Sequence, residues 1–157
     1  MNYKLAIIAA SIDRGIDPAI PLAVATRESG VQQFRPDGSI VVGKAGEIGI
    51  FQVKPSSAPG VDLRDPQANI NAGVSMLASL HRQFRGWPLA LAAYNWGEHN
   101  VRQAMAGIKT VPASVTSYVT AVLGPGQLSV SPAGRLSPAA IVVGVIFGAG
   151  IFLIALR

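Results

Sequence analysis

The chain of 157 residues contains no cysteine, and this absence excludes a disulfide scaffold, a cysteine-ligated zinc finger and thiol catalysis. It contains only two histidines, His81 and His99, and neither has a cysteine or carboxylate at the spacing of metal ligands. We therefore expect both histidines to be ordinary surface or core residues. The sequence predicts no metal site and no cofactor.

Nucleic-acid-binding motifs and internal repeats are also missing from the sequence. Lys and Arg exceed Asp and Glu, which gives a formal net charge of +5, but the basic residues are scattered rather than clustered. A basic surface attracts anionic cell-wall polymers, lipid headgroups and nucleic acid alike. The charge by itself therefore selects no partner, and without a motif we expect no nucleic-acid partner.

Start and stop signals for helices are spread over residues 1–123, a length that can bury one core. Asp17 and Asp65 are each followed by a proline, which combines an N-cap with a residue suited to the first turn, and glycines end the apolar segments. The pair Asp37-Gly38 predicts a small β-hairpin. The expected helices cover Tyr3 to Arg14, Pro18 to Glu28, Pro66 to Arg85, Pro88 to Trp96, Glu98 to Ala106 and Ala113 to Leu123.

Three short segments stand out in this helical framework. They are Arg27-Glu28-Ser29-Gly30, Gly46-Glu47-Ile48-Gly49-Ile50-Phe51-Gln52-Val53 and Ala93-Tyr94-Asn95-Trp96-Gly97. In this order they resemble the catalytic domain of the soluble lytic transglycosylases of the lysozyme-like superfamily, over roughly residues 16–123. The resemblance implies a mainly α, α+β lysozyme-like fold: a compact helical domain with a small β-hairpin.

The resemblance also implies a function, the cleavage of the β-1,4 bond between N-acetylmuramic acid and N-acetylglucosamine in peptidoglycan. Glu28 would protonate the leaving oxygen and then, as a carboxylate, deprotonate the 6-hydroxyl of the muramic acid, so that a 1,6-anhydro ring forms. This double role requires a glutamic acid that is still protonated near neutral pH, hence an apolar surrounding. The uncharged residues 19–25 before Glu28 can supply it. The simpler interpretation is a solvated carboxylate at a helix end.

Family resemblance further implies a set of substrate-binding residues: Ser29, Gly49, Phe51, Gln52, Tyr94, Asn95 and Trp96. Phe51 replaces a methionine that is common in the family, and Glu47 stands where family members have a small residue. Tyr118, in the segment that resembles the family's final helix, is expected to pack rather than to take part in chemistry. The alternative for Tyr94 and Trp96 is that they are ordinary core aromatics, and for residues 46–53 it is a plain hairpin with Gln52 at its edge.

Two other functions remain open from the sequence. A hydrolytic lysozyme on the same fold would need a second acid to direct a water molecule, and Asp37, Glu47, Asp62 and Asp65 are the candidates. A non-catalytic viral membrane protein that binds glycan or supports a particle is the third possibility. The presence of both Glu28 and Tyr94 argues against it.

After residue 123 the composition changes. Residues 124–137 are rich in Pro, Gly and Ser and predict a linker, which as a flexible coil would span about 20 Å. Residues 138–157 are expected to form a transmembrane anchor, because Ala139 to Leu156 contain no polar side chain and a helix of that length nearly matches a bilayer of about 30 Å. Gly144 and Gly148 have a spacing that permits helix self-association.

The N-terminus bears on localisation. Lys4 and the apolar run Leu5 to Ala10 are similar to the start of a signal peptide, but the run is too short, so we interpret it as the first helix. A wall-cutting enzyme with a C-terminal anchor and no export signal would leave its catalytic domain in the cytoplasm. We therefore expect a virion enzyme in the membrane of a bacteriophage, which opens peptidoglycan during genome entry; the alternative is a bacterial inner membrane.

Overall fold

The computed structural model describes residues 1–128, 130 and 134–136. The expected anchor at 138–157, with Ala139 to Leu156 and the glycines Gly144 and Gly148, lies outside the described residues. Within them, no helix is both long and apolar enough to cross a membrane. The helices are α1 (Tyr3–Asp13), α2 (Ala19–Ser29), α3 (Pro66–Phe84), α4 (Trp87–Trp96), α5 (Glu98–Met105) and α6 (Ala113–Leu123), with a 3-10 turn η1 (Pro55–Ser57) between α2 and α3.

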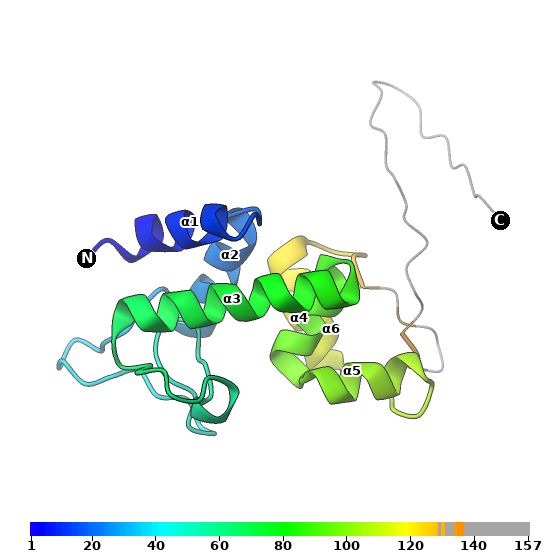
Figure 1. Cartoon of the computed structure of the whole chain (residues 1–157). Helices are drawn as coiled ribbons and strands as arrows, with labels where there is room; N and C mark the ends of the chain where they lie inside the picture. The colour runs from blue at the N-terminus through cyan, green and yellow to red at the C-terminus, as the bar shows by residue number, and fades with distance from the viewer. Residues whose placement is uncertain (129, 131–133, 137–157) are drawn as a thin grey trace.

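Helix α3 is the central element of the domain. It packs against α1, α2 and α4, and α4 in turn packs against α5 and α6. Figure 1 shows the loops between α2 and α3 beside the first half of α3, and α4, α5 and α6 grouped around its other end. The buried stripe of α3 includes Ile70, Val74 and Leu77, none of which is exposed to solvent. Their i, i+4, i+7 spacing is the one that predicted a buried helix face.

The predicted helix boundaries are confirmed to within a few residues. The carboxylate of Asp65 accepts a hydrogen bond of 2.7 Å from the backbone N–H of Ala68, so it caps α3 as expected. Asp17 accepts one of 2.9 Å from the N–H of Ala19, the first residue of α2. Gly97, with a positive φ of 95°, separates α4 from α5 and lets the chain turn between them.

The expected β-hairpin is present only as isolated antiparallel bridges. Phe34 pairs with Ile40 around the turn at Asp37-Gly38, and Ile48 pairs with both Val42 and Val53. Among the described residues these pairings do not extend into strands, so the domain is mainly α rather than a clear α+β fold. The turn itself is well made, since Asp37 accepts hydrogen bonds from the N–H and the hydroxyl of Ser39.

The described part of segment 124–137, which was expected to be a linker, returns to the domain. Leu136 is only 4% exposed and belongs to the hydrophobic core. Val130 pairs with Leu136, and the carbonyl of Gly134 accepts a hydrogen bond of 3.1 Å from the N–H of Val111. Val130 and Leu136 are apolar residues within the Pro/Gly/Ser-rich sequence. Packing their side chains against the domain removes apolar surface from contact with water, which favours the contact.

Candidate active site

Glu28 is placed by the end of α2. The helix closes at Gly30, whose left-handed φ of 68° lets its N–H reach the carbonyls of Ala25 and Thr26. Beside Glu28, the hydroxyl of Ser29 donates a hydrogen bond of 2.8 Å to the carbonyl of Ile50. This bond fastens the end of α2 to segment 46–53, and so fixes the direction from which Glu28 enters the site.

Segment 46–53 is itself held by two buried amide side chains, Gln33 and Asn69, both fully shielded from solvent. Gln33 accepts the N–H of Ile50 at 3.1 Å, and Asn69 accepts the N–H of Phe51 at 3.0 Å. A Cβ on Gly49 would lie 2.2 Å from the side-chain oxygen of Gln33, so only glycine fits there. Sequence reasoning missed Gln33 and Asn69, because isolated amides far apart in the chain carry no local pattern.

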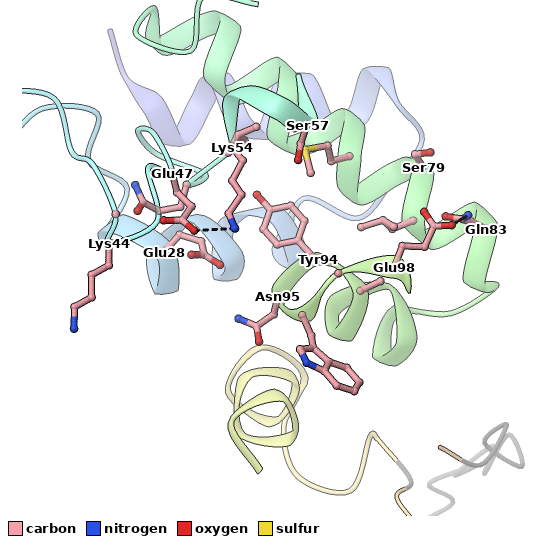
Figure 2. Close-up of a pocket in the computed structure, with 18 residues that line it drawn as sticks. Glu28, Lys44, Glu47, Lys54, Ser57, Ser79, Gln83, Tyr94, Asn95 and Glu98 are labelled. Atoms are coloured by element: carbon pink, nitrogen blue, oxygen red, sulfur yellow. Dashed lines mark hydrogen bonds and ion pairs between the residues drawn. The ribbon is translucent and has the colours of Figure 1, made fainter. Parts of the chain in front are cut away.

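These elements enclose a cleft of about 630 Å³. Figure 2 shows Glu28, Glu47 and Tyr94 pointing into it, with Ser79 and Gln83 of α3 at one end. The residues that line the cleft are Glu28, Gly43, Lys44, Glu47, Gln52, Val53, Lys54, Ser57, Met76, Ser79, Leu80, Gln83, Ala93, Tyr94, Asn95, Trp96, Gly97 and Glu98.

Glu28 has the electrostatic character of a proton donor. Burial raises the pKa of its carboxyl above the usual value of 4.5, and the negative charge of Glu47 raises it further. A hydrogen bond from Tyr118 and the positive charge of Arg27 act in the opposite direction, but burial is the largest effect. Glu28 is therefore half-buried in the cleft rather than a solvated helix-end carboxylate, and its burial has the effect on the pKa that the proposed role requires.

Tyr118 is the residue whose role sequence reasoning underestimated. Its hydroxyl donates a hydrogen bond of 2.6 Å to Oε1 of Glu28, and its ring lies under the guanidinium of Arg27, 5.2 Å from the centroid. Tyr118 is 4% exposed, so it packs as expected, but it also contacts the acid directly. The one sequence feature that pointed to Tyr118 was its place in the segment that resembles the family's final helix. The contact between Tyr118 and Glu28 arises because α6 packs against α2.

Tyr94, Asn95 and Trp96 at the end of α4 line the same cleft as Glu28. The Tyr94 hydroxyl donates a hydrogen bond of 2.6 Å to the carbonyl of Phe51, which joins α4 to segment 46–53. Burial and the nearby charge of Glu28 raise the pKa of Tyr94 well above its ordinary value. Asn95 and Trp96 also line the cleft, with Asn95 exposed and Trp96 partly buried beneath Lys109.

The other expected substrate-binding residues divide into two groups. Gln52 lines the cleft, with its amide nitrogen bonded to the carbonyl of Gly49 at 2.9 Å. Ser29, Gly49 and Phe51 do not line it. Phe51 is fully buried, and it lies so close to Gly73 of α3 that a Cβ there would be 2.2 Å from its ring. These three residues therefore support the wall of the cleft from behind and do not face its interior.

Of the four acids considered for a second catalytic carboxylate, Glu47 is the one that lines the cleft. Asp37 lies in the exposed hairpin turn, while Asp62 and Asp65 accept backbone N–H groups in the loop before α3 and at its cap. Backbone hydrogen bonds lower the pKa of Glu47, including one of 3.0 Å from the N–H of Ala45. Its Oε1 lies 3.5 Å from Nζ of Lys54.

The two histidines are not grouped with acids: in the described part of the chain no three His, Cys, Asp or Glu side chains could hold a metal ion together. His81 instead stacks on the ring of Trp87, with centroids 4.2 Å apart.

Comparison with known families agrees with this geometry. The family model described as the transglycosylase SLT domain matches residues 5–115. The chain belongs to this family. The SLT domain has a lysozyme-like fold, and its match covers Glu28, segment 46–53 and the Tyr94 region, while Tyr118 lies just beyond it. No sequence among the curated proteins matches the chain significantly.

Solved structures similar to this SLT domain come from much longer proteins. The lytic transglycosylase Slt of Pseudomonas aeruginosa, in an inactive glutamate-to-glutamine mutant, matches with a TM-score of 0.65 and 23% identity over 79% of this chain. The 70 kDa soluble lytic transglycosylase of Escherichia coli matches with 0.64 and 26% over 78%. Its complex with bulgecin A matches with 0.64 and 25% over 77%. The match covers 23% of the length of each of these chains.

Proposed function

We propose that this SLT domain is a peptidoglycan lytic transglycosylase in which Glu28 is both the acid and the base. The observation that carries the proposal is the state of Glu28: a carboxyl with a raised pKa, hydrogen-bonded by Tyr118, in a cleft whose volume is that of a typical ligand-binding pocket. The similar Pseudomonas aeruginosa enzyme is described as inactive when one glutamate is replaced by glutamine, which is consistent with an essential glutamate in this chain.

The hydrogen bond from Tyr118 engages Oε1 of Glu28 and leaves Oε2 available for proton transfer. In the proposed reaction Oε2 therefore carries the acidic proton of the neutral carboxyl. Oε2 donates it to the glycosidic oxygen as the C1–O bond of N-acetylmuramic acid breaks. The carboxylate then accepts the proton of the 6-hydroxyl while O6 bonds to C1. The acid is regenerated, and no water is consumed.

Digestion of purified peptidoglycan in heavy-oxygen water, followed by mass spectrometry of the products, tests this chemistry. The transglycosylase should release 1,6-anhydromuramoyl products that carry no heavy oxygen. Products that are heavier by one labelled water would instead identify a hydrolase. A chain that binds peptidoglycan without releasing any product would be the non-catalytic glycan-binding protein, and the proposal would be wrong.

Hydrolysis on the same fold is the second candidate, and the position of Glu47 is what favours it. A carboxylate with a lowered pKa beside a carboxyl with a raised one is the arrangement of paired acid and base groups in glycosidases. However, Glu47 is occupied by the N–H of Ala45 and by Lys54. We therefore favour the transglycosylase, in which Glu47 acts on Glu28 through its charge.

For localisation we propose attachment to a lipid bilayer through Ala139 to Leu156, in the virion membrane of a bacteriophage, where the enzyme opens the cell wall locally during genome entry. The support is the sequence itself: this segment has no polar side chain and nearly the length of a bilayer span. The full chain should float with liposomes in a density gradient, whereas a chain that ends at Leu136 should not. If both remain away from lipid, the anchor proposal fails while the enzymatic one stands.

A further inference from the structure

The last residue of α5 and the loop after it expose apolar side chains. Met105 is 47% exposed and Ile108 is 74% exposed, which makes Ile108 one of the most exposed large apolar residues in the described part of the chain. The adjacent Lys109 is also exposed. These three residues, Met105, Ile108 and Lys109, are called the loop patch below.

The described C-terminal residues lie against the same loop. Gly134 bonds to Val111, and a Cβ on Gly134 would be 2.3 Å from the side chain of Thr110. The guanidinium of Arg135 lies against Gly107 in the same way, at 3.1 Å from the position of a Cβ there. These contacts place residues 134 and 135 against the loop that follows α5.

The described chain therefore runs along the loop after α5 as far as Leu136, three positions before the apolar segment begins in the sequence. Leu136 is buried in the core, so the chain is fixed to the domain at that residue. Only residues 137 and 138 separate Leu136 from the start of the proposed anchor in the sequence. In the proposed anchored chain the flexible connection is therefore shorter than a free linker of about fourteen residues.

The charge of this region also suits a lipid surface. No Asp or Glu follows Glu98 anywhere in the chain, whereas Lys109 and Arg135 are exposed beside the apolar loop. Exposed apolar side chains flanked by cations are the features of segments that enter the boundary of an anionic bilayer. The exposed residues Leu5 and Ile12 on α1 form a rival apolar face, but the acidic Asp13 is the neighbour of Ile12 in the chain.

We propose that the loop patch is a membrane-contacting surface that inserts Met105 and Ile108 into the bilayer interface beside the C-terminal anchor. This inference depends on the anchor proposed above. It fixes the orientation of the cleft, because Lys109 also bonds to Asn100 at 2.6 Å and lies 5.4 Å from the ring centre of Trp96 at the cleft. The rim formed by Trp96 is then next to the membrane, and the enzyme cuts the glycan strands nearest to the bilayer.

The absence of cysteine makes a direct test possible. Single cysteines are introduced into the full chain at Ile108 (Ile108→Cys) and, as a matched control, at Ile12 (Ile12→Cys), which is 65% exposed. Each is labelled with a polarity-sensitive fluorophore and reconstituted into liposomes that contain phosphatidylglycerol. The label at 108 should be quenched by spin-labelled lipid and protected from aqueous iodide several-fold more than the label at 12. Liposomes of phosphatidylcholine alone should give a smaller difference.

Each other outcome overturns the inference in a distinguishable way. Equal exposure of both labels to iodide in chains that float with lipid shows an anchored domain whose loop patch is free of the membrane. Lipid quenching at 12 but not at 108 assigns the membrane contact to α1. Failure of the full chain to float removes the anchor and this inference together, while product analysis on peptidoglycan tests the enzymatic proposal separately.

Discussion

The hydroxyl of Tyr118 donates a 2.6 Å hydrogen bond to Oε1 of Glu28, although 90 positions separate the two residues in the chain. Because a tyrosine hydroxyl can donate to a carboxylate as well as to a neutral carboxyl, the bond persists through both steps of the proposed reaction. Tyr118 therefore orients the acid and moderates the rise of its pKa that burial causes. This pair gives a set of measurable consequences for rate and pH dependence.

Glu28→Gln should abolish turnover while preserving the fold. The amide keeps the size of the side chain but cannot exchange a proton, and a general acid or base contributes about 10²- to 10⁴-fold in rate. One group that performs both roles should give a loss at the upper end of this range or beyond it. Product release from peptidoglycan measures the rate, and thermal unfolding is the control. Near-normal turnover in the folded variant would contradict the assignment.

Two variants should move the pH profile in opposite directions. Activity requires neutral Glu28 in the free enzyme, so kcat/KM falls as the pH rises through its pKa. Tyr118→Phe removes a hydrogen bond that lowers this pKa, so the fall should shift to higher pH. Glu47→Gln removes a negative charge that raises it, so the fall should shift to lower pH.

The measurement is the pH profile of kcat/KM for each variant and for the unaltered chain. A lower overall rate alone would not distinguish a changed pKa of Glu28 from a disturbed structure. Shifts in the same direction, or none, would show that neither residue tunes Glu28. A Glu47→Gln variant that specifically loses water-labelled products would instead identify Glu47 as the base of a hydrolase.

Tyr94→Phe should reduce both stability and rate. The variant leaves the carbonyl of Phe51 without its 2.6 Å hydrogen bond, and an unsatisfied buried group costs about 1 to 3 kcal/mol of unfolding free energy. Tyr3→Phe is the matched control, because the Tyr3 hydroxyl has no hydrogen-bond partner within the described residues. Denaturant unfolding compares the two. Equal stabilities would mean that the bond to Phe51 is not needed to hold the cleft wall.

Leu136→Ala should destabilise the domain although the residue lies within the Pro/Gly/Ser-rich segment. Leu136 is 4% exposed, and truncation of a buried leucine to alanine costs about 2 to 5 kcal/mol. Leu5→Ala, at a side chain that is 63% exposed, is the control and should change little. The measurement is urea unfolding of the chain that ends at Leu136. If both changes are equally mild, the C-terminal residues contribute nothing to the core.

The sequence by itself determined the helices and singled out Glu28 as the candidate acid. Asp65 and Pro66 specify where α3 begins through local capping, and the spacing of Ile70, Val74 and Leu77 specifies its buried face. Glu28 was found because its flanking residues and two later motifs form an ordered pattern. Such patterns are local in the chain, because capping and helix periodicity depend on residues that are only a few positions apart.

Only the tertiary structure decided which residues meet. Tyr118 contacts Glu28 because α6 packs on α2, and Phe51 is buried because segment 46–53 is held by the amides of Gln33 and Asn69. The return of Leu136 to the core was likewise unpredictable from a Pro/Gly/Ser-rich composition. These contacts join positions distant in the chain, and their free energy comes from burial and hydrogen bonds that exist only once the helices have packed.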